Sequence, residues 1–269
     1  MNKLIFTPDF TNRGLLREFK SNKLNIKEYE NRDSLGKDAA RTVAKIMKNV
    51  IDEKGKVRMV FASAPSQNDF LNCLKEDKSI NWSKVYAFHM DNYVGLPVDH
   101  PQSFSQFLID RLFKDIPEVN FYPINSEAKD PDAEVKRYKD LLLEEPLDIM
   151  ILGIGESGHL AFIDPPFCDF NDDSFFKISP LDEETLIQQV HDGCFAKKEE
   201  VPTTAYTLTI DACLSCPFTI AIVPTELKAK AIKAVVEGPI TTKVPASKLQ
   251  EKENAWLMID KDSGSLLNK

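Results

Sequence analysis

The sequence predicts an α/β fold, a Rossmann-like, doubly wound and mainly parallel sheet with helices on both faces. Short runs rich in Val, Ile, Leu, Met and Phe recur along the chain, and longer amphipathic stretches separate them. This alternation is typical of parallel strands joined by crossover helices. Several of the runs are continuously apolar, as strands buried on both faces of a sheet should be.

Seven apolar runs are the expected strands: Leu24–Tyr29, Val57–Ser63, Lys84–His89, Leu147–Gly153, Tyr206–Ile210, Phe218–Val223 and Ala255–Ile259. Five periodic stretches are the expected helices: Ser34–Asp52, Gln67–Leu74, Ser103–Phe113, Asp132–Leu143 and Glu226–Val236. The first helix follows Asp33 and Ser34, which are good N-cap types, and is expected to end near Gly55. Leu35, Ala39 and Val43 place its apolar residues on one face.

The 269 residues, 42% of them hydrophobic, are enough to bury a full core. We find no repeat, low-complexity tract or Gly/Ser linker, so we expect a single domain over residues 1–269, with 1–23 as an N-terminal extension. The stretch Phe162–Val201 has no clear period and contains Pro165, Pro166 and Pro180. Such a stretch is often a lid or binding loop, and a helical insertion is the alternative.

A net charge of −8 disfavours broad binding to nucleic acid or to an anionic membrane. The N-terminal apolar run breaks at Pro8 and Asp9, unlike a secretory signal, and no run approaches the roughly 18 apolar residues of a membrane span. We therefore expect a cytoplasmic protein whose partner is a small molecule.

Five cysteines without disulfide density predict reduced thiols. Cys213 and Cys216 have CxxC spacing, but the chain has no second CxxC. No metal site is expected either, because the four histidines show no paired ligand spacing. They are His89, His100, His159 and His191.

The loop after the strand at 147–153 contains Gly153-x-Gly155-x-x-Gly158-His159, the glycine spacing of a dinucleotide fingerprint. Such a fingerprint opens a long helix, whereas the prolines at 165 and 166 would end a helix within about two turns. We therefore expect the glycines to let the backbone approach a small ligand, with His159 at its edge. A structural turn with an incidental histidine is the alternative.

Asp91 follows another expected strand, at the carboxyl edge of the sheet where ligands bind in open α/β folds. A carboxylate there can act as a general base if partial burial raises its pKa. The alternative is a turn cap.

Two further segments indicate an anion site. Ser63-Ala64-Pro65-Ser66-Gln67 supplies hydroxyls and backbone N–H groups at a helix N-terminus, although an ordinary helix cap has the same composition. Lys228 falls in the first turn of the last long helix, which is unfavourable for a cation unless an anion is nearby. The alternative for Lys228 is a surface lysine.

These segments resemble the glucosamine-6-phosphate deaminase/isomerase family over most of the chain. Met90-Asp91-Asn92-Tyr93-Val94-Gly95-Leu96-Pro97, followed by His100-Pro101-Gln102-Ser103-Phe104, is similar to the family's M-D-E-Y-V-G-L-P and H-P-x-S-[YF] segments. The run from Gly153 to Phe162 is similar to its G-x-G-x-x-G-H-[IL]-A-F loop, and Lys228 lies in a segment similar to its phosphate-contacting helix.

The resemblance implies a cofactor-independent reaction on a hexosamine 6-phosphate: ring opening, aldose-to-ketose proton transfer and loss of ammonia. Asp91 matches the general base and His159 the ring-opening acid/base. Asp164 stands where the family has a Glu that supports the histidine, and Lys228 would hold the phosphate. The expected binding residues are Ser63, Ala64, Ser66, Gln67, Gly155, Gly158 and Lys228. Relatives form several assemblies, so a homo-oligomer is left open.

The chain departs from the family pattern at several positions. Ser157 replaces an acidic residue before Gly-His, and its hydroxyl can orient the imidazole without stabilising its cation. Asn92 replaces a Glu, and Pro65 removes a backbone donor from the phosphate loop. The family's phosphate-binding Arg has no clear match within 185–193.

Two alternatives follow. A 6-phosphogluconolactonase-like hydrolase would have a similar loop, but this chain lacks that family's Asp-Glu-Arg segment after the corresponding strand. A catalytically degenerate sugar-phosphate sensor is motivated by Ser157 and the altered phosphate loop.

Overall fold

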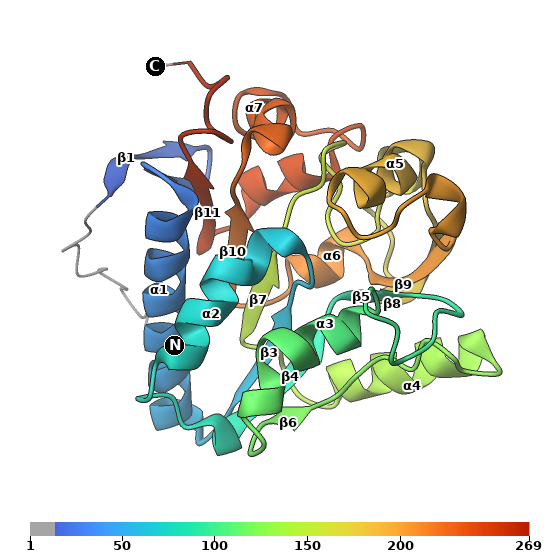
Figure 1. The fold of residues 1–269 in the computed structure, drawn as a ribbon. Coiled ribbons are helices and arrows are strands. Elements are labelled where there is room, and N and C mark those ends of the chain that lie inside the picture. Colours follow the sequence, from blue (N-terminus) through green and yellow to red (C-terminus); the bar gives the residue numbers. More distant parts are fainter. Residues whose placement is uncertain (1–13, 269) are drawn as a thin grey trace.

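The computed structural model describes residues 14–268 and contains a central eight-stranded sheet (Figure 1). Its order is β1-β2-β11-β10-β7-β3-β4-β6, and every neighbouring pair is parallel except the β1–β2 hairpin. The strands are β1 (Leu15–Ser21), β2 (Leu24–Tyr29), β3 (Val57–Phe61), β4 (Val85–His89), β6 (Asn120–Phe121), β7 (Ile149–Leu152), β10 (Phe218–Val223) and β11 (Ala255–Asp260). The predicted fold class is confirmed.

Helices cover both faces of this sheet. On one face, α1 (Arg32–Lys54), α2 (Asn68–Glu76) and α3 (Phe104–Arg111) share a core with β3 and β4. On the other face, α4 (Pro131–Leu143), α6 (Ile210–Cys213) and α7 (Ala229–Glu237) contribute to a second core. Each of the five predicted helices is present, with ends shifted by a few residues.

Helix α1 shows how local sequence sets these boundaries. Asn31 is its N-cap and accepts a hydrogen bond from the Ser34 N–H, so the helix begins earlier than predicted. Gly55 ends it in the left-handed conformation, with φ of 78°, as a glycine C-cap does without steric cost.

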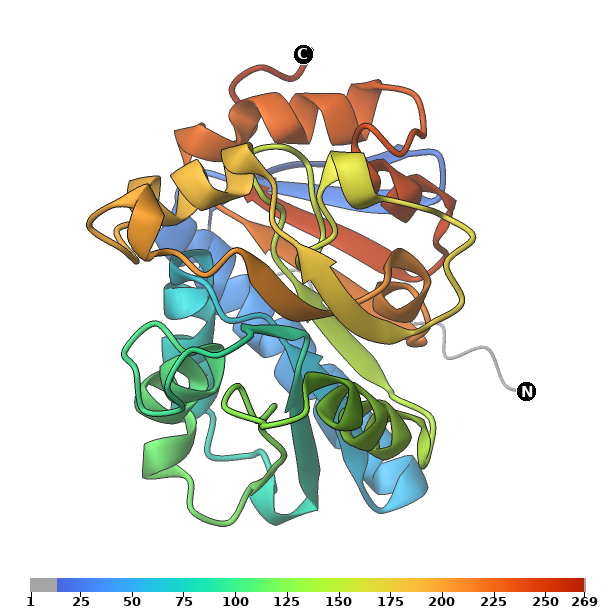
Figure 2. The same ribbon diagram turned by 90° about the vertical axis from the view of Figure 1, so that its right-hand side faces the viewer.

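A second, antiparallel sheet lies across the main sheet (Figure 2) and has the order β5-β9-β8. Its strands are β5 (Asp91–Tyr93), β8 (Phe176–Pro180) and β9 (Thr204–Leu208). The strand predicted at Tyr206–Ile210 is therefore present as β9, but it belongs to this antiparallel sheet and not to the parallel one. Thr209 ends the strand and caps α6 by accepting a hydrogen bond from the Ala212 N–H.

The stretch 162–201 forms structure of its own. It contains β8, the helix α5 (Glu183–His191) and two single-turn 3-10 helices, Pro165–Phe167 and Lys198–Glu200. Leu181, Leu186 and Phe195 pack with Tyr93 and Phe162 in a separate small core. The stretch therefore contains a helix, as the helical alternative expected, together with a strand.

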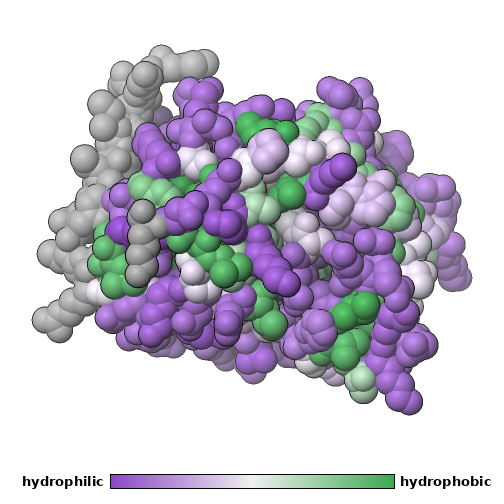
Figure 3. Space-filling model, turned by 90° about the horizontal axis from the view of Figure 1, so that it is seen from above, coloured by the Kyte–Doolittle hydropathy of each residue, from purple (hydrophilic) through white to green (hydrophobic). Residues whose placement is uncertain are grey.

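Part of the expected N-terminal extension belongs to the sheet. Residues 1–13, with Pro8 and Asp9, lie outside the described residues, whereas Leu15–Ser21 is strand β1, paired with β2. Between residues 14 and 268, no helix has both the length and the apolar content needed to span a bilayer. On the face seen in Figure 3, apolar side chains form separate patches among hydrophilic ones.

Candidate active site

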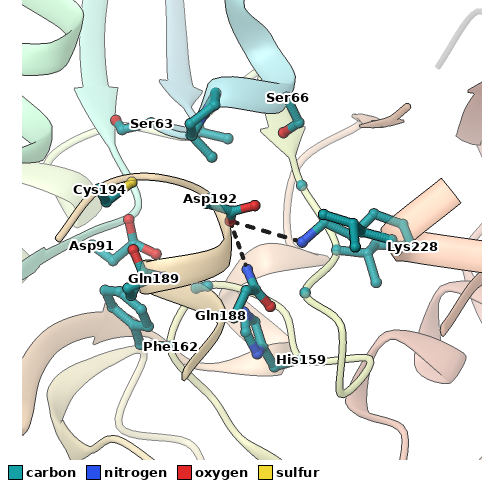
Figure 4. A pocket seen from close by; sticks show the side chains of 18 of the residues that line it. Ser63, Ser66, Asp91, His159, Phe162, Gln188, Gln189, Asp192, Cys194 and Lys228 are labelled. Atoms are coloured by element: carbon teal, nitrogen blue, oxygen red, sulfur yellow. Dashed lines mark hydrogen bonds and ion pairs between the residues drawn. The ribbon is translucent and has the colours of Figure 1, made fainter. Parts of the chain in front are cut away.

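A cavity of about 290 Å³ opens where β3, β4, β7 and β10 end, and the segment from α5 to Cys194 forms part of its wall. Seven of the predicted site residues line it: Ser63, Ala64, Ser66, Asp91, Gly155, His159 and Lys228. Ser157 and Asp164 lie behind His159 and contact it, while Gln67 and Gly158 are packed away from the cavity. Figure 4 shows how the labelled side chains face one another.

Asp91 is the first residue of β5, two residues after β4 ends at His89. Its carboxyl group lines the cavity, yet only 5% of the residue is exposed. Burial raises the pKa of Asp91 well above its ordinary value, because the charged form loses hydration. A raised pKa makes the ionised form of this carboxyl group a stronger base.

The backbone of Asp91 is held by a buried histidine. His89 Nε2 lies 2.9 Å from the Ile124 N–H and must accept from it, so Nδ1 carries the proton and donates to the Asp91 carbonyl at 2.9 Å. Burial lowers the pKa of His89 to about 3, which keeps the ring neutral. His89 is therefore a positioning residue beneath the site.

His159 is oriented by three oxygen atoms around one ring nitrogen. Asp164 Oδ1, Ser157 Oγ and Thr185 Oγ1 each lie 3.0 Å from His159 Nδ1. Thr185 also donates to Asp164 Oδ1 at 2.6 Å, and the carboxylate can only accept. The proton of neutral His159 is thus on Nδ1, which leaves Nε2 free to accept a proton.

Asp164 is completely buried, and three contacts keep it ionised. Burial alone would raise its pKa, but hydrogen bonds to His159, the Asp182 N–H and Thr185 more than offset this and lower the pKa. Asp164 therefore supports the imidazole despite being shorter than Glu, and Ser157 and Thr185 add neutral contacts.

The glycines of the loop have packing roles. A Cβ atom on Gly155 would lie 2.1 Å from His159 Cε1, so only glycine leaves room for the ring. Gly158 has φ of +81°, and a Cβ atom there would lie 2.8 Å from Val244 Cγ1. No helix follows these glycines, because a Leu160–Ile163 bridge and the 3-10 turn at Pro165 come next.

Asn92 faces away from the cavity. Its Oδ1 accepts from the Tyr93 N–H at 3.0 Å and from the Phe104 N–H at 3.1 Å, which satisfies a free donor at the start of α3. Asn92 therefore caps α3, and the same side chain also binds the backbone of the neighbouring Tyr93.

The segment after β3 forms a polar wall opposite His159. Ser63 Oγ is buried and has no hydrogen-bond partner within residues 14–268, so it is available to a ligand. Gln67 lies beneath, where its amide donates to Ser66 Oγ at 2.9 Å and to the Ile222 carbonyl at 3.0 Å. Gln67 therefore positions the segment and does not line the cavity.

Lys228 ends the 3-10 turn Glu226–Lys228 and points into the cavity. Only 5% of the residue is exposed, so the surface-lysine alternative is wrong. Burial lowers its pKa, and the nearby Asp192 and Glu156 carboxylates partly oppose this effect. The Thr225 N–H, bonded to Asp260, fixes the start of this turn.

Sequence reasoning missed several lining residues. Gln188 accepts from the Glu156 N–H at 2.7 Å, and Gln189 accepts from the Tyr93 hydroxyl at 2.8 Å, so α5 is tied to the walls. Arg32 lines the opposite rim, where it donates to the Pro65 carbonyl at 3.4 Å and to Asp69 at 2.7 Å. Cys194 also lines the cavity, and none of these residues lies in a recognisable motif. Asp192, which belongs to the aperiodic stretch in which a binding loop was one expectation, lines the cavity as well.

Residues 30–258 match the family model described as glucosamine-6-phosphate isomerases/6-phosphogluconolactonase. The chain belongs to this family. Family members are enzymes, and so is this chain. It is 34% identical over 240 residues to a glucosamine-6-phosphate deaminase of Lactobacillus delbrueckii subsp. bulgaricus, covering 88% of this chain and 97% of the relative.

Two further relatives agree with this assignment. A glucosamine-6-phosphate deaminase of Streptococcus uberis is 36% identical over 191 residues, which covers 70% of this chain and 79% of that protein. A solved structure of a monomeric glucosamine-6-phosphate deaminase superposes with a TM-score of 0.81 at 27% identity, covering 90% of this chain and 99% of that one.

Metal ligands are not grouped anywhere between residues 14 and 268, where no cluster of three or more His, Cys, Asp or Glu side chains could hold an ion. The five cysteines are free thiols, and both Cys213 and Cys216 are buried.

Proposed function

We propose that the chain converts a hexosamine 6-phosphate into a ketohexose 6-phosphate and ammonia by aldose–ketose isomerisation and deamination. The observation that carries the proposal is the convergence of buried Asp91, oriented His159 and buried Lys228 on one cavity. Relatives named glucosamine-6-phosphate deaminase, aligned over most of the chain, point to the same substrate class.

In this proposal His159 opens the sugar ring. Its free Nε2 takes the proton of the anomeric hydroxyl and returns a proton to the ring oxygen, which frees the C1 aldehyde. Asp164 holds the proton on Nδ1 and stabilises the imidazolium that forms between these two transfers.

Asp91 then moves a proton from C2 to C1. The aldehyde acidifies the C2–H bond, and the raised pKa of Asp91 matches it to this task. After the transfer the C2–nitrogen bond is an imine, to which water adds before ammonia leaves. The reaction consumes one water molecule and needs no electron acceptor.

Lys228 and Ser66 would hold the phosphate, with Ser63 Oγ as a further donor. Arg32 would supply a second positive charge from the rim, in place of the arginine that the 185–193 segment lacks. A guanidinium already bonded to the Pro65 carbonyl is well placed, because the loop that it contacts is the one that forms the phosphate wall.

The test is ammonia release by the purified protein with glucosamine 6-phosphate and galactosamine 6-phosphate side by side. Release that is lost in Asp91→Asn, with unchanged folding, supports the proposal and identifies the preferred epimer. The family also contains 6-phosphogluconolactonases. No ammonia release together with rapid hydrolysis of 6-phosphogluconolactone would refute the proposal.

We further propose that this enzyme acts in the cytoplasm on a small molecule, without nucleic acid or membrane. Its free cysteines are compatible with a reducing compartment. The single-domain organisation is supported by β2 pairing with β11 across the sequence. Light scattering of the purified protein would decide between a monomer and a homo-oligomer, and limited proteolysis would reveal a second domain if one existed.

A further inference from the structure

The lysine at the proposed phosphate site already has a negatively charged neighbour. Asp192 follows α5 as its C-cap, and its Oδ2 lies 3.9 Å from Lys228 Nζ (Figure 4). The same carboxylate accepts a hydrogen bond from Gln188 Nε2 at 3.2 Å. Asp192 therefore acts as a counter-ion that the chain supplies to its own binding site.

Lys228 is buried and Asp192 is largely buried, so the charge of Asp192 acts strongly on any anion near Lys228. Lys228 is almost completely buried, and only 17% of the Asp192 side chain is exposed. In such a setting a neighbouring charge is screened much less than at the surface. A phosphate that approached Lys228 would therefore meet strong repulsion from the Asp192 carboxylate.

The geometry leaves Lys228 able to exchange partners. A separation of 3.9 Å is too long for a hydrogen bond, so the Lys228 N–H groups remain available to phosphate oxygens. The Asp192 backbone is fixed by its N–H bond to the Gln188 carbonyl, whereas its carboxylate is held by one side-chain bond. The carboxylate can turn away while α5 stays in place.

We propose that Asp192 competes with the substrate phosphate for Lys228 and thereby sets how tightly that phosphate is held. An entering anion must displace this carboxylate, so the Asp192 charge weakens the binding of the phosphate. The inference rests on the proposed function only in taking the natural anion to be the phosphate of a hexosamine 6-phosphate. It concerns how tightly that group is held, and not the proton transfers at Asp91 and His159.

The first experiment measures binding of inorganic phosphate by titration calorimetry at low ionic strength. Asp192→Asn keeps the shape and the contact with Gln188 but removes the charge, and we expect it to bind phosphate at least about fivefold more tightly than the parent protein. The matched control is Asp211→Asn, which removes a charge from an exposed position on α6 and should leave the affinity unchanged. Asp192→Ser is a second variant with the same expected direction.

Unchanged or weaker phosphate binding in both Asp192 variants, with melting temperatures like that of the parent protein, would overturn the inference. It would mean that Asp192 merely holds Lys228 in position. Steady-state kinetics add a second readout, since KM for the hexosamine 6-phosphate should fall in Asp192→Asn with a far smaller change in kcat.

The two proposals can fail separately. Tighter phosphate binding in Asp192→Asn without ammonia release from any hexosamine 6-phosphate would refute the proposed function and leave the inference standing. Normal ammonia release, together with a phosphate affinity that is the same in the parent protein and in Asp192→Asn, would refute the inference and leave the proposed function standing.

Discussion

Asp91→Asn is expected to stabilise the folded protein, and to do so more strongly at pH 8 than at pH 5. Burial raises the pKa of Asp91 in the folded state, whereas in the unfolded chain the carboxyl group titrates near its ordinary value of about 3.9. Between these two pKa values the folded protein keeps a proton that the unfolded chain releases. The free energy of unfolding therefore decreases as the pH rises, and Asn removes this loss because it does not titrate.

The size of this pH effect on the free energy of unfolding follows from the binding of a single proton by Asp91. Each pH unit between the unfolded and folded pKa values of Asp91 lowers the free energy of unfolding by about 1.4 kcal/mol. The stability difference between Asp91→Asn and the parent protein should grow by that amount per unit and level off above the folded pKa. Urea denaturation of both proteins at pH 5, 6, 7 and 8 measures it.

The control for this series is Asp211→Asn, which makes the same substitution at an exposed position on α6. A difference for Asp91→Asn that changes with pH no more than that of the control would refute the argument that burial governs the Asp91 carboxyl group. Asp91→Asn should also lower kcat/KM for ammonia release by a factor of at least about 10² to 10⁴, the usual worth of general acid/base catalysis.

Three other substitutions test the supporting residues. Thr185→Val removes the hydroxyl between His159 and Asp164 and should lower kcat about tenfold, the worth of one hydrogen bond, while Thr185→Ser should retain activity. Asn92→Ala should lower the free energy of unfolding by about 1–2 kcal/mol in urea denaturation because the α3 cap is lost. Gly155→Ala should abolish ammonia release by displacing the His159 ring, whereas a Cβ atom at Gly153 meets nothing closer than 3.7 Å. An active Gly155→Ala variant would contradict the packing argument.

The central strands could be predicted from sequence because burial on both faces leaves them continuously apolar. Ile149–Leu152 in β7 and the stretch 220–223 in β10 show this pattern clearly. Strand β1 was missed because its residues alternate between exposed and half-buried positions at the edge of the sheet. Helix α5 was missed because its buried positions include Thr185, Gln188 and Gln189, which are polar and carry no hydrophobic period.

The candidate site was predictable only where local motifs carry it. Asp91 and His159 stand in recognisable segments at strand ends, and the structure brings both to one cavity. Thr185, Asp192 and Arg32 reach this region from other elements, and their roles depend on tertiary contacts that no local pattern encodes. The charge balance around Lys228 is likewise a property of the folded chain.

The pairing of β2 with β11 constrains the order in which the chain can fold. Strand β2 is made before its parallel neighbour β11, which ends at Asp260, so the β1–β2 hairpin has no sheet to join until residues 255–260 have left the ribosome. Closing such a distant contact is slow because of the entropy of the intervening loop. Until then, chaperones that bind the nascent chain would encounter two unpaired surfaces together, the edge of β10 and the β1–β2 hairpin.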